Sequence, residues 1–520
     1  MMLMQNALLG RVHSQMEYVT VQDSTFGNDS QTRSSIRGMS ALVFVSSGTT
    51  EPSTYRPLSR GEEVQSSIVT IFSIWNSMMG VSILSMPWGL YQAGFGFGLL
   101  LLVAVGMIIS YTAYLITLSK NKLDPGKPML YDFPDICRSL YGRPGEILAV
   151  SFSIFVLIGA VLAYWVLMSN FLYFTGILFY VHCEMDIGSL PLRNLSTSPT
   201  IFGSTFAEVW QLRVSTILLY QKTIMFFFCN PPATKEIATN PIYVKHLHYF
   251  QRSVPIYLAV LVFPFLNFKS PTVFTKFTAL GTVSVLYLIG FNTIQLVKCG
   301  PHWNFINDTS PHYIEQFKWH FPAFTGLLTM SFFIHNSILT ILGCQRHPEN
   351  NTRDLSIGYA LVGMSYIAIS VTFYIAFPFP RSCILDNLLN NFDDSYLPSS
   401  VARVLIFFQM FSIFPLIMYL IRSQISCLLY NNPWPGIVFV LLLNTIIVSL
   451  AVLTAVFYPK VGSIVRYFGA VSGMVLIYAL PCLVYMKLSS RAFELSTPKV
   501  IFHSSIIVFG VANLLAQFLV

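Results

Sequence analysis

Polar residues and a glycine interrupt a long apolar stretch of the sequence between residues 68 and 93. Asn76 and Ser77 lie near its middle, and Gly80 follows three residues later. Gly80 tolerates unusual backbone angles, so the pattern predicts a membrane helix that breaks here. The carbonyl end of the first half suits a cation or an amino group, and the amide end of the second half suits a carboxylate. The predicted ligand-binding turn consists of Ser77, Met78, Met79, Gly80, Val81 and Ser82.

An alternative interpretation is that Asn76 and the serines form hydrogen bonds between helices and bind nothing. Two later apolar runs carry polar residues that favour the binding site. His335 and Asn336 interrupt the sixth run, where we expect a second break facing the substrate. A histidine at this depth is either a proton relay or a hydrogen-bonded core residue.

The eighth apolar run contains Ser412, three residues after Gln409. A hydroxyl oxygen is a suitable ligand for a hard cation. We therefore predict a sodium site made of Asn76 and Ser412. The alternative for Ser412 is a hydrogen bond to its own preceding helical turn.

These residues require a membrane scaffold, and the composition indicates one. Of the 520 residues, 54% are hydrophobic and 10% charged, against about 25% charged residues in a typical soluble domain. Apolar runs of about 20 residues, the length that crosses a bilayer, recur from Ile68 onward. Eleven spans are predicted, at residues 68–93, 95–119, 147–180, 253–268, 272–297, 321–344, 354–378, 400–424, 434–458, 461–487 and 498–520. The predicted fold class is an all-α membrane protein with eleven transmembrane helices.

Lys and Arg are more frequent in the connections on the side of the N-terminus, which predicts a cytosolic N-terminus and a C-terminus on the opposite side. Residues 1–67 are predicted to be a disordered cytosolic tail, and residues 68–520 the membrane domain. Residues 181–252 are expected to form a long loop on the outer side. Within it, the apolar run 214–229 could instead be a twelfth, short span with Lys222 at its centre.

Covalent modifications are predicted on the same outer side. Asn194 and Asn307 begin Asn-x-Ser/Thr motifs there and are expected to be glycosylated. Cys183, Cys229 and Cys383 also lie on this side, where disulfides can form. We predict a Cys229–Cys383 disulfide, with unpaired thiols as the alternative, because sequence does not fix connectivity.

Several classes of protein are disfavoured. The net charge is +8, but the basic residues are scattered along the connections, so no nucleic-acid partner is expected. The cysteines have no spacing that suits zinc. Walker, HExxH and GxSxG motifs are absent from the sequence and few carboxylates lie in the spans, so we expect neither a pump nor an enzyme. A channel is a stronger alternative to a transporter than an enzyme is, although the sequence has no filter motif.

Long motifs resemble solute carrier family 38, over residues 65–520 apart from the 181–252 loop. They include SIVTIFSIWNSMMGVSILSMPWG, LIGAVLAYWVLMSNFL, LNFKSPTVFTKF, LTMSFFIHNSI and KVIFHSSIIVFGVANLLAQF. The resemblance implies a leucine-transporter-type fold, in which two inverted repeats of five helices precede one extra helix. It also implies an amino-acid substrate of the arginine, leucine or glutamine class at the first broken helix. Asn76 and Ser412 match the family's sodium positions, so sodium is the expected cofactor.

Within this family, the motifs look most like a lysosomal, arginine-sensing branch. The resemblance implies a lysosomal (late endosomal) membrane protein with a lumenal C-terminus, surrounded by lipid that includes cholesterol as a candidate ligand. Residues 1–67 would then contact a Rag GTPase/Ragulator scaffold, and residues 55–58 read as a tyrosine-based sorting signal. Val81 and Ser412 depart from the branch, which has threonine at both positions. The alternatives are a receptor that signals through residues 1–67 with little transport, and a plasma-membrane sodium-coupled neutral amino-acid transporter.

Overall fold

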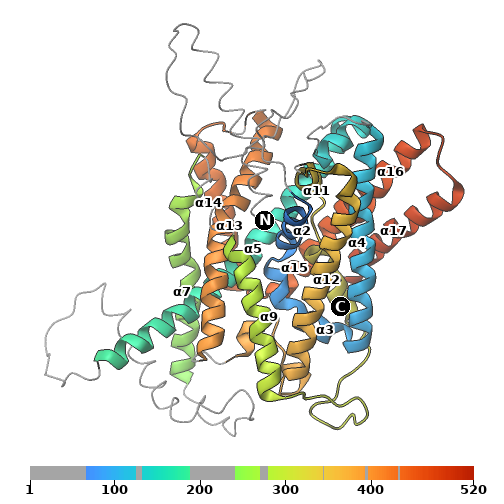
Figure 1. Ribbon diagram of the computed structural model, residues 1–520. Coiled ribbons are helices and arrows are strands. Elements are labelled where there is room, and N and C mark those ends of the chain that lie inside the picture. The colour runs from blue at the N-terminus through green and yellow to red at the C-terminus, as the bar shows by residue number, and fades with distance from the viewer. Residues whose placement is uncertain are drawn as a thin grey trace.

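The computed structural model describes residues 66–123, 132–187, 241–269, 279–343, 345–392, 396–430, 432 and 434–519. Within these ranges the regular structure is helical and contains no strand, apart from isolated bridge residues that include the pair Asn304 and Tyr313. The helices are α2 (Ser67–Met78), α3 (Met86–Ala93), α4 (Phe95–Leu123), α5 (Phe133–Ile187), α7 (Pro241–Leu266), α9 (Ala279–Cys299), α10 (Phe321–Ser331), α11 (Ile338–Gly343), α12 (Asn351–Ala376), α13 (Leu397–Tyr430), α14 (Ile437–Phe457), α15 (Val461–Gly473), α16 (Leu480–Arg491) and α17 (Thr497–Ala516). Shorter turns are η1 (Val81–Ser85), η2 (Pro348–Asn350), η3 (Arg381–Cys383), η4 (Leu388–Asn391) and the π-turn η5 (Met474–Ala479). Together they form an upright helical bundle (Figure 1).

Eight helices of the described part are long and apolar enough to cross a membrane, and the bent pair Ser67–Met78 and Val81–Ala93 makes a ninth. All eleven predicted spans overlap helices of the structure. The fourth predicted span coincides with a shorter apolar helix, Ser253–Leu266, and the sixth is divided between α10 and α11. A multi-pass, all-α membrane protein is therefore confirmed, and eleven crossings stay a prediction.

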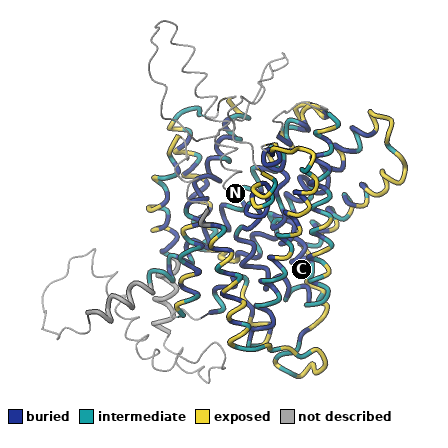
Figure 2. Tube along the Cα trace, in the orientation of Figure 1, coloured by how far each residue is buried: buried dark blue, intermediate teal, exposed yellow. Residues whose placement is uncertain are grey.

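Burial distinguishes central helices from peripheral ones (Figure 2). In the most apolar stretch of each segment, 72% of the residues are buried in Val461–Arg491 and 67% in α13. The corresponding shares are 28% in α14 and 22% in α17. The outward faces carry large apolar side chains, and Val260, Leu442 and Ile446 are each more than half exposed. Such faces suit lipid, so α14 and α17 lie at the periphery of the bundle and α13 near its centre.

The first predicted break is present. α2 ends at Met78, and the chain resumes at Val81 as the 3₁₀ turn η1, which continues into α3. Between them Gly80 is extended, with φ −102° and ψ −154°, and the two halves of the span are bent by 56°. The Ser77 hydroxyl donates to Ser73 O at 2.6 Å, a contact that favours bending of the helix just before the break.

A second break divides the sixth predicted span. α10 ends at Ser331, the chain is non-helical over 332–337, and α11 begins at Ile338. His335 and Asn336 lie in this non-helical turn, as the sequence predicts. The first and sixth spans in chain order are thus both broken, which is the arrangement expected of two repeated halves.

Two helices are longer than predicted. α5 extends over Phe133–Ile187, where the sequence predicts 147–180, and α7 begins at Pro241 and not at 253. The first part of α5 is set off by a kink at Gly142, whose φ of 69° favours glycine, and Pro144 follows it. The remainder of the predicted outer loop, with Asn194 and the run 214–229, lies outside the described residues, as do residues 1–65.

The predicted Cys229–Cys383 disulfide is wrong. Cys383 ends the turn η3 as a free and exposed thiol. Cys299, at the end of α9, is disulfide-bonded. Cys229 lies outside the described residues, and Asn307 of the predicted glycosylation motif is exposed on the segment between α9 and α10.

Arg381, just after α12, holds the segment between α9 and α10 in place. Its buried guanidinium donates to Phe377 O at 2.5 Å and to His302 O. The His302 and His312 rings lie 5.1 Å apart. Burial lowers the pKa of His312 below its usual 6.5, and the neighbouring His302 and Arg381 lower it further. The folded segment therefore holds His312 neutral.

Acidification should destabilise this segment. The unfolded chain takes up a proton on His312 near pH 6.5 while the folded chain resists it, so this stability is present above that pH and is lost below it. We expect the thermal unfolding temperature to fall as the pH drops from about 7 to about 5, and His312→Gln to flatten the fall. The exposed His320 of the same segment supplies the control, and equal flattening by His320→Gln would contradict the assignment.

Candidate functional site

The carbonyl end of α2 is open where the helix breaks. Met79 N still donates to Trp75 O at 3.1 Å. Gly80 N, however, turns back to Met78 O at 2.8 Å, so the helical bond to Asn76 O is not made. A carbonyl at a helix C-terminus carries partial negative charge and attracts an ammonium group or an alkali cation.

The amide end of the resumed helix faces the same break. Gly80 precedes η1 and provides no side-chain cap for its first amide groups. These groups have no partner within the helix, and the helix dipole favours a carboxylate beside them. Val81 and Ser82 are 8% and 5% exposed, so their amides are shielded from solvent. The break therefore presents two poles of opposite sign within a few residues.

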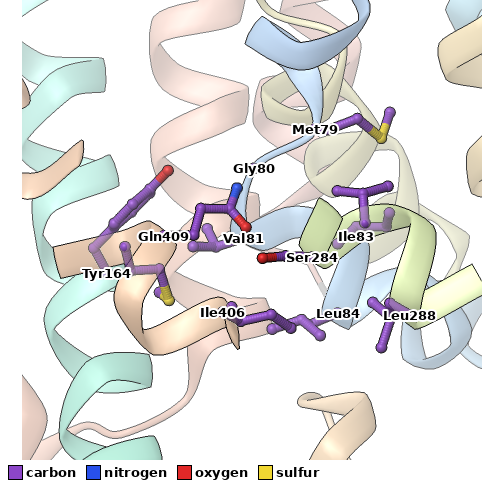
Figure 3. A pocket seen from close by; sticks show the side chains of 12 residues that line it. Met79, Gly80, Val81, Ile83, Leu84, Tyr164, Ser284, Leu288, Ile406 and Gln409 are labelled. Atoms are coloured by element: carbon purple, nitrogen blue, oxygen red, sulfur yellow. The ribbon is translucent and has the colours of Figure 1, made fainter. Parts of the chain in front are cut away.

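A small pocket lies against the break (Figure 3). It is lined by Met79, Gly80, Val81, Ile83 and Leu84 of the first span, Tyr164 of α5, Ser284, Val285 and Leu288 of α9, and Ile406, Gln409 and Met410 of α13. Most of the wall is apolar, with a few polar groups that can orient a ligand. The free space in the pocket is about large enough for one water molecule. An amino acid can enter only when the helices separate.

Two side-chain amides lie close to Gly281 of α9. A Cβ atom on Gly281 would lie 3.0 Å from Gln409 Nε2 and 3.3 Å from Asn76 Oδ1. Asn76 Oδ1 is buried and has no hydrogen-bond partner among the described residues. A buried oxygen without a partner is costly, so this position favours a cation or a polar ligand group.

The structure places Ser412 on the same helix as Gln409, one turn further on. Ser412 is 4% exposed, and its hydroxyl donates to Gln409 O at 2.8 Å. This is the contact described by the alternative interpretation of Ser412. The oxygen keeps its capacity to accept, so the contact is also compatible with a cation ligand.

His335 faces α4 and is not among the residues that line the pocket. Its Nε2 lies 2.9 Å from Thr112 Oγ1, and that hydroxyl donates to Ile109 O at 2.9 Å. Because the hydroxyl has one hydrogen, this network assigns the donor role to His335 Nε2. Asn336 Oδ1 accepts from Ser337 Oγ at 3.1 Å. Both residues support the second break, and their contact with substrate stays a prediction.

Two polar residues of the pocket were missed from the sequence. The Tyr164 hydroxyl lies 3.9 Å from where a Cβ on Gly80 would be, and Ser284 faces the pocket from α9. Tyr164 is the one hydroxyl residue of the apolar run LIGAVLAYWV, whereas Ser284 is one of three in LGTVSVLYLI. A hydroxyl group in mid-span is a signal of a polar cavity, but it does not indicate which helix lies opposite.

Known proteins provide an independent comparison. Residues 63–193 and 217–519 match the family model described as transmembrane amino acid transporter protein. The chain is 46% identical over 459 residues to a Caenorhabditis elegans protein named sodium-coupled neutral amino acid transporter 9 homolog, covering 88% of this chain and 74% of that protein. It is 38% identical over 480 residues to neutral amino acid transporter 9 of Danio rerio, covering 89% and 84%. Among solved structures, MhsT in complex with L-phenylalanine is 13% identical, with a TM-score of 0.45 and coverage of 88% and 99%.

A bundle with a helix broken around a small pocket is the architecture of many secondary transporters. The chain belongs to the transmembrane amino acid transporter protein family. Its similarity to proteins named neutral amino acid transporter 9 confirms the resemblance found in the sequence motifs. These relatives are transporters, so the prediction that the chain is not an enzyme is confirmed.

Gly281→Ala tests whether the pocket depends on the narrow space between α9 and the side-chain amides of Asn76 and Gln409. The added methyl group would crowd Gln409 Nε2 at 3.0 Å and displace the side chains around it. We expect uptake of amino acid into proteoliposomes to fall about tenfold, because small displacements at a binding site are costly. Gly290→Ala on the same helix is the matched control, since its methyl group would meet nothing within 4 Å. An equal loss in both variants would place the defect in α9 as a whole.

Proposed function

We propose that the chain moves an amino acid across the membrane by alternating access, with the substrate held at the break between α2 and η1. The main support is that the carbonyl end of α2 and the amide end of η1 lie at the same pocket. The substrate ammonium group would contact the carbonyl end near Asn76, and its carboxylate the amides of Val81 and Ser82. The substrate side chain would extend among the pocket residues of α5, α9 and α13.

The closed pocket supports a cycle in which two sides open in turn. Since about one water molecule fits beside the break, substrate entry and release each require helices to separate. The non-helical residues of the first and sixth spans are the natural hinges for this motion. We further propose the leucine-transporter-type arrangement of two inverted repeats and an eleventh helix, which the two breaks at corresponding positions support.

Sodium is the proposed co-transported ion. The residues fit a hard monovalent cation, because Asn76 Oδ1 is a buried oxygen without a partner among the described residues and Ser412 Oγ retains acceptor capacity. Asn76 and Ser412 would hold the ion. The bound ion would supply positive charge beside the break, and its gradient would drive uptake. The name of the Caenorhabditis elegans relative includes the words sodium-coupled.

Asn76→Ala should remove the dependence of uptake on sodium, because it deletes the unpartnered oxygen. Uptake into proteoliposomes would be measured in sodium and in potassium, and the ratio of the two rates should approach one. Thr372→Ala is the control, since that hydroxyl bonds within its own helix to Ala368 O at 2.6 Å. A ratio unchanged in Asn76→Ala would contradict the sodium site.

Val81 is the residue of the break through which we expect substrate preference to be set. It lines the pocket and presents a β-branched side chain without a hydroxyl. Val81→Thr keeps the shape and adds a hydrogen-bonding group, so the preference for arginine over leucine should rise by about tenfold, the effect of one hydrogen bond.

Radiolabelled uptake of arginine, leucine and glutamine measures this preference. Val262→Thr is the control, because Val262 is a buried residue of α7 that does not line the pocket. If Val81→Thr leaves the relative uptake of the three substrates unchanged, the assignment of Val81 is refuted.

We also propose a lysosomal (late endosomal) membrane as the location, with a cytosolic N-terminus and a lumenal C-terminus. The motif resemblance supports the location, and the distribution of Lys and Arg supports the orientation. Contact of residues 1–67 with a Rag GTPase/Ragulator scaffold, and glycosylation of Asn194 and Asn307, are proposed on the same grounds.

A further inference from the structure

One tyrosine hydroxyl lies between the two breaks. Tyr366 Oη of α12 is 2.7 Å from Met78 O, the last carbonyl group of α2, and 3.0 Å from Ser331 O, the last carbonyl group of α10. The Tyr366 side chain is fully buried, so bulk water does not compete for these contacts. Two helices that are far apart in the sequence thus end at the same hydroxyl group.

The hydroxyl cannot satisfy both carbonyl groups fully, because a phenol has one hydrogen to donate. Each carbonyl group also carries the partial negative charge of a helix C-terminus. In a buried setting two such ends repel each other unless a donor stands between them. Ser82 of η1 is a further hydrogen-bonding neighbour of Tyr366, so the second half of the broken first span meets at the same point.

A second tyrosine of α12 serves one break and not the other. Tyr359 lies seven residues earlier, on the same face of the helix. Its hydroxyl donates to Phe332 O at 3.2 Å, in the turn that follows α10. Its ring also stacks on that of Phe332, so the hydrogen bond and the ring contact of Tyr359 both lie at the second break. Tyr366 therefore contacts both breaks, whereas Tyr359 contacts the second break.

We propose that Tyr366 is a positioning residue that couples the two breaks and stabilises the closed state of the pocket. When the ends of α2 and α10 move apart, the hydroxyl can stay with one carbonyl group and release the other. Without the hydroxyl, Met78 O keeps its contact with Gly80 N, but the two carbonyl groups lose the donor that they share. The closed state then becomes less stable, and both breaks open more often.

Hydrogen exchange of the full chain in lipid nanodiscs tests this coupling directly. In Tyr366→Phe, we expect amide exchange to rise about tenfold at both breaks, in peptides covering residues 77–83 and 331–337. In the matched variant Tyr359→Phe, exchange should rise at residues 331–337 alone. A response of Tyr366→Phe at one break, or of Tyr359→Phe at both, would overturn the proposal.

The effect on transport rests on the proposed function and is measured separately. A closed state that is less stable slows each passage through it, while the backbone groups that bind substrate in the open states remain. Turnover per folded molecule in Tyr366→Phe should fall about tenfold, with the Kd for substrate changed less than about twofold. A parallel loss of affinity and turnover would indicate a general structural defect and would refute the coupling role. If the unmodified chain transports no amino acid, the proposed function fails, and the exchange experiment still decides the coupling.

A measurement on the unmodified chain covers the case in which Tyr366→Phe does not fold. If one hydroxyl couples the breaks, the amides of residues 77–83 and 331–337 should share one opening equilibrium as the temperature is raised. Their exchange rates should then rise in parallel, while the exposed segment between α9 and α10 follows its own course. Independent opening of the two breaks would overturn the proposal.

Discussion

The carbonyl groups of Met78 and Ser331 end two helices inside the bundle, at residues that are 3% and 1% exposed. In the hydrocarbon region of a membrane, an unpaired backbone group costs several kcal/mol. A break is therefore possible only where neighbouring side chains provide hydrogen bonds. α12 provides them, through Tyr366 at both breaks and Tyr359 at the second. The placement of α12 thus stabilises both breaks, and Gly80 N adds a further contact to Met78 O.

Close packing brings α12 to that place. A Cβ on Gly358 of α12 would lie 2.6 Å from the Ile74 side chain, so the contact of α12 with α2 depends on the missing side chain. Gly469 of α15 has the same role at α10, because its Cβ would lie 2.6 Å from Gly326 O. Small residues allow membrane helices to approach in this way. Glycines outside the pocket therefore fix the distances on which the pocket depends.

The sequence predicts the breaks better than it predicts their surroundings. Asn76 and Gly80 stand out in an apolar run, and α2 ends between them at Met78. His335 and Asn336 mark the second break for the same reason. Tyr366 carries no such signal, because a tyrosine in an apolar helix is an ordinary residue until its neighbours in space are known.

Contacts between segments that are distant in the chain could not be predicted from the sequence either. The oxidising side of the membrane limits which cysteines can pair, but geometry decides, and Cys299 is bonded while Cys383 is free. From the sequence, His335 is either a proton relay or a hydrogen-bonded core residue, and its contact with Thr112 depends on how α4 packs. Residue type predicts what a side chain can do, whereas topology determines what it meets.

The size of the closed pocket has an electrical consequence. A space for about one water molecule cannot hold a continuous file of water across the bundle. Ions and protons cross hydrocarbon with difficulty unless such a file solvates them. In this state the pocket offers no such path, and a transporter whose pocket is closed to water lets the membrane keep its voltage and its ion gradients between transport events.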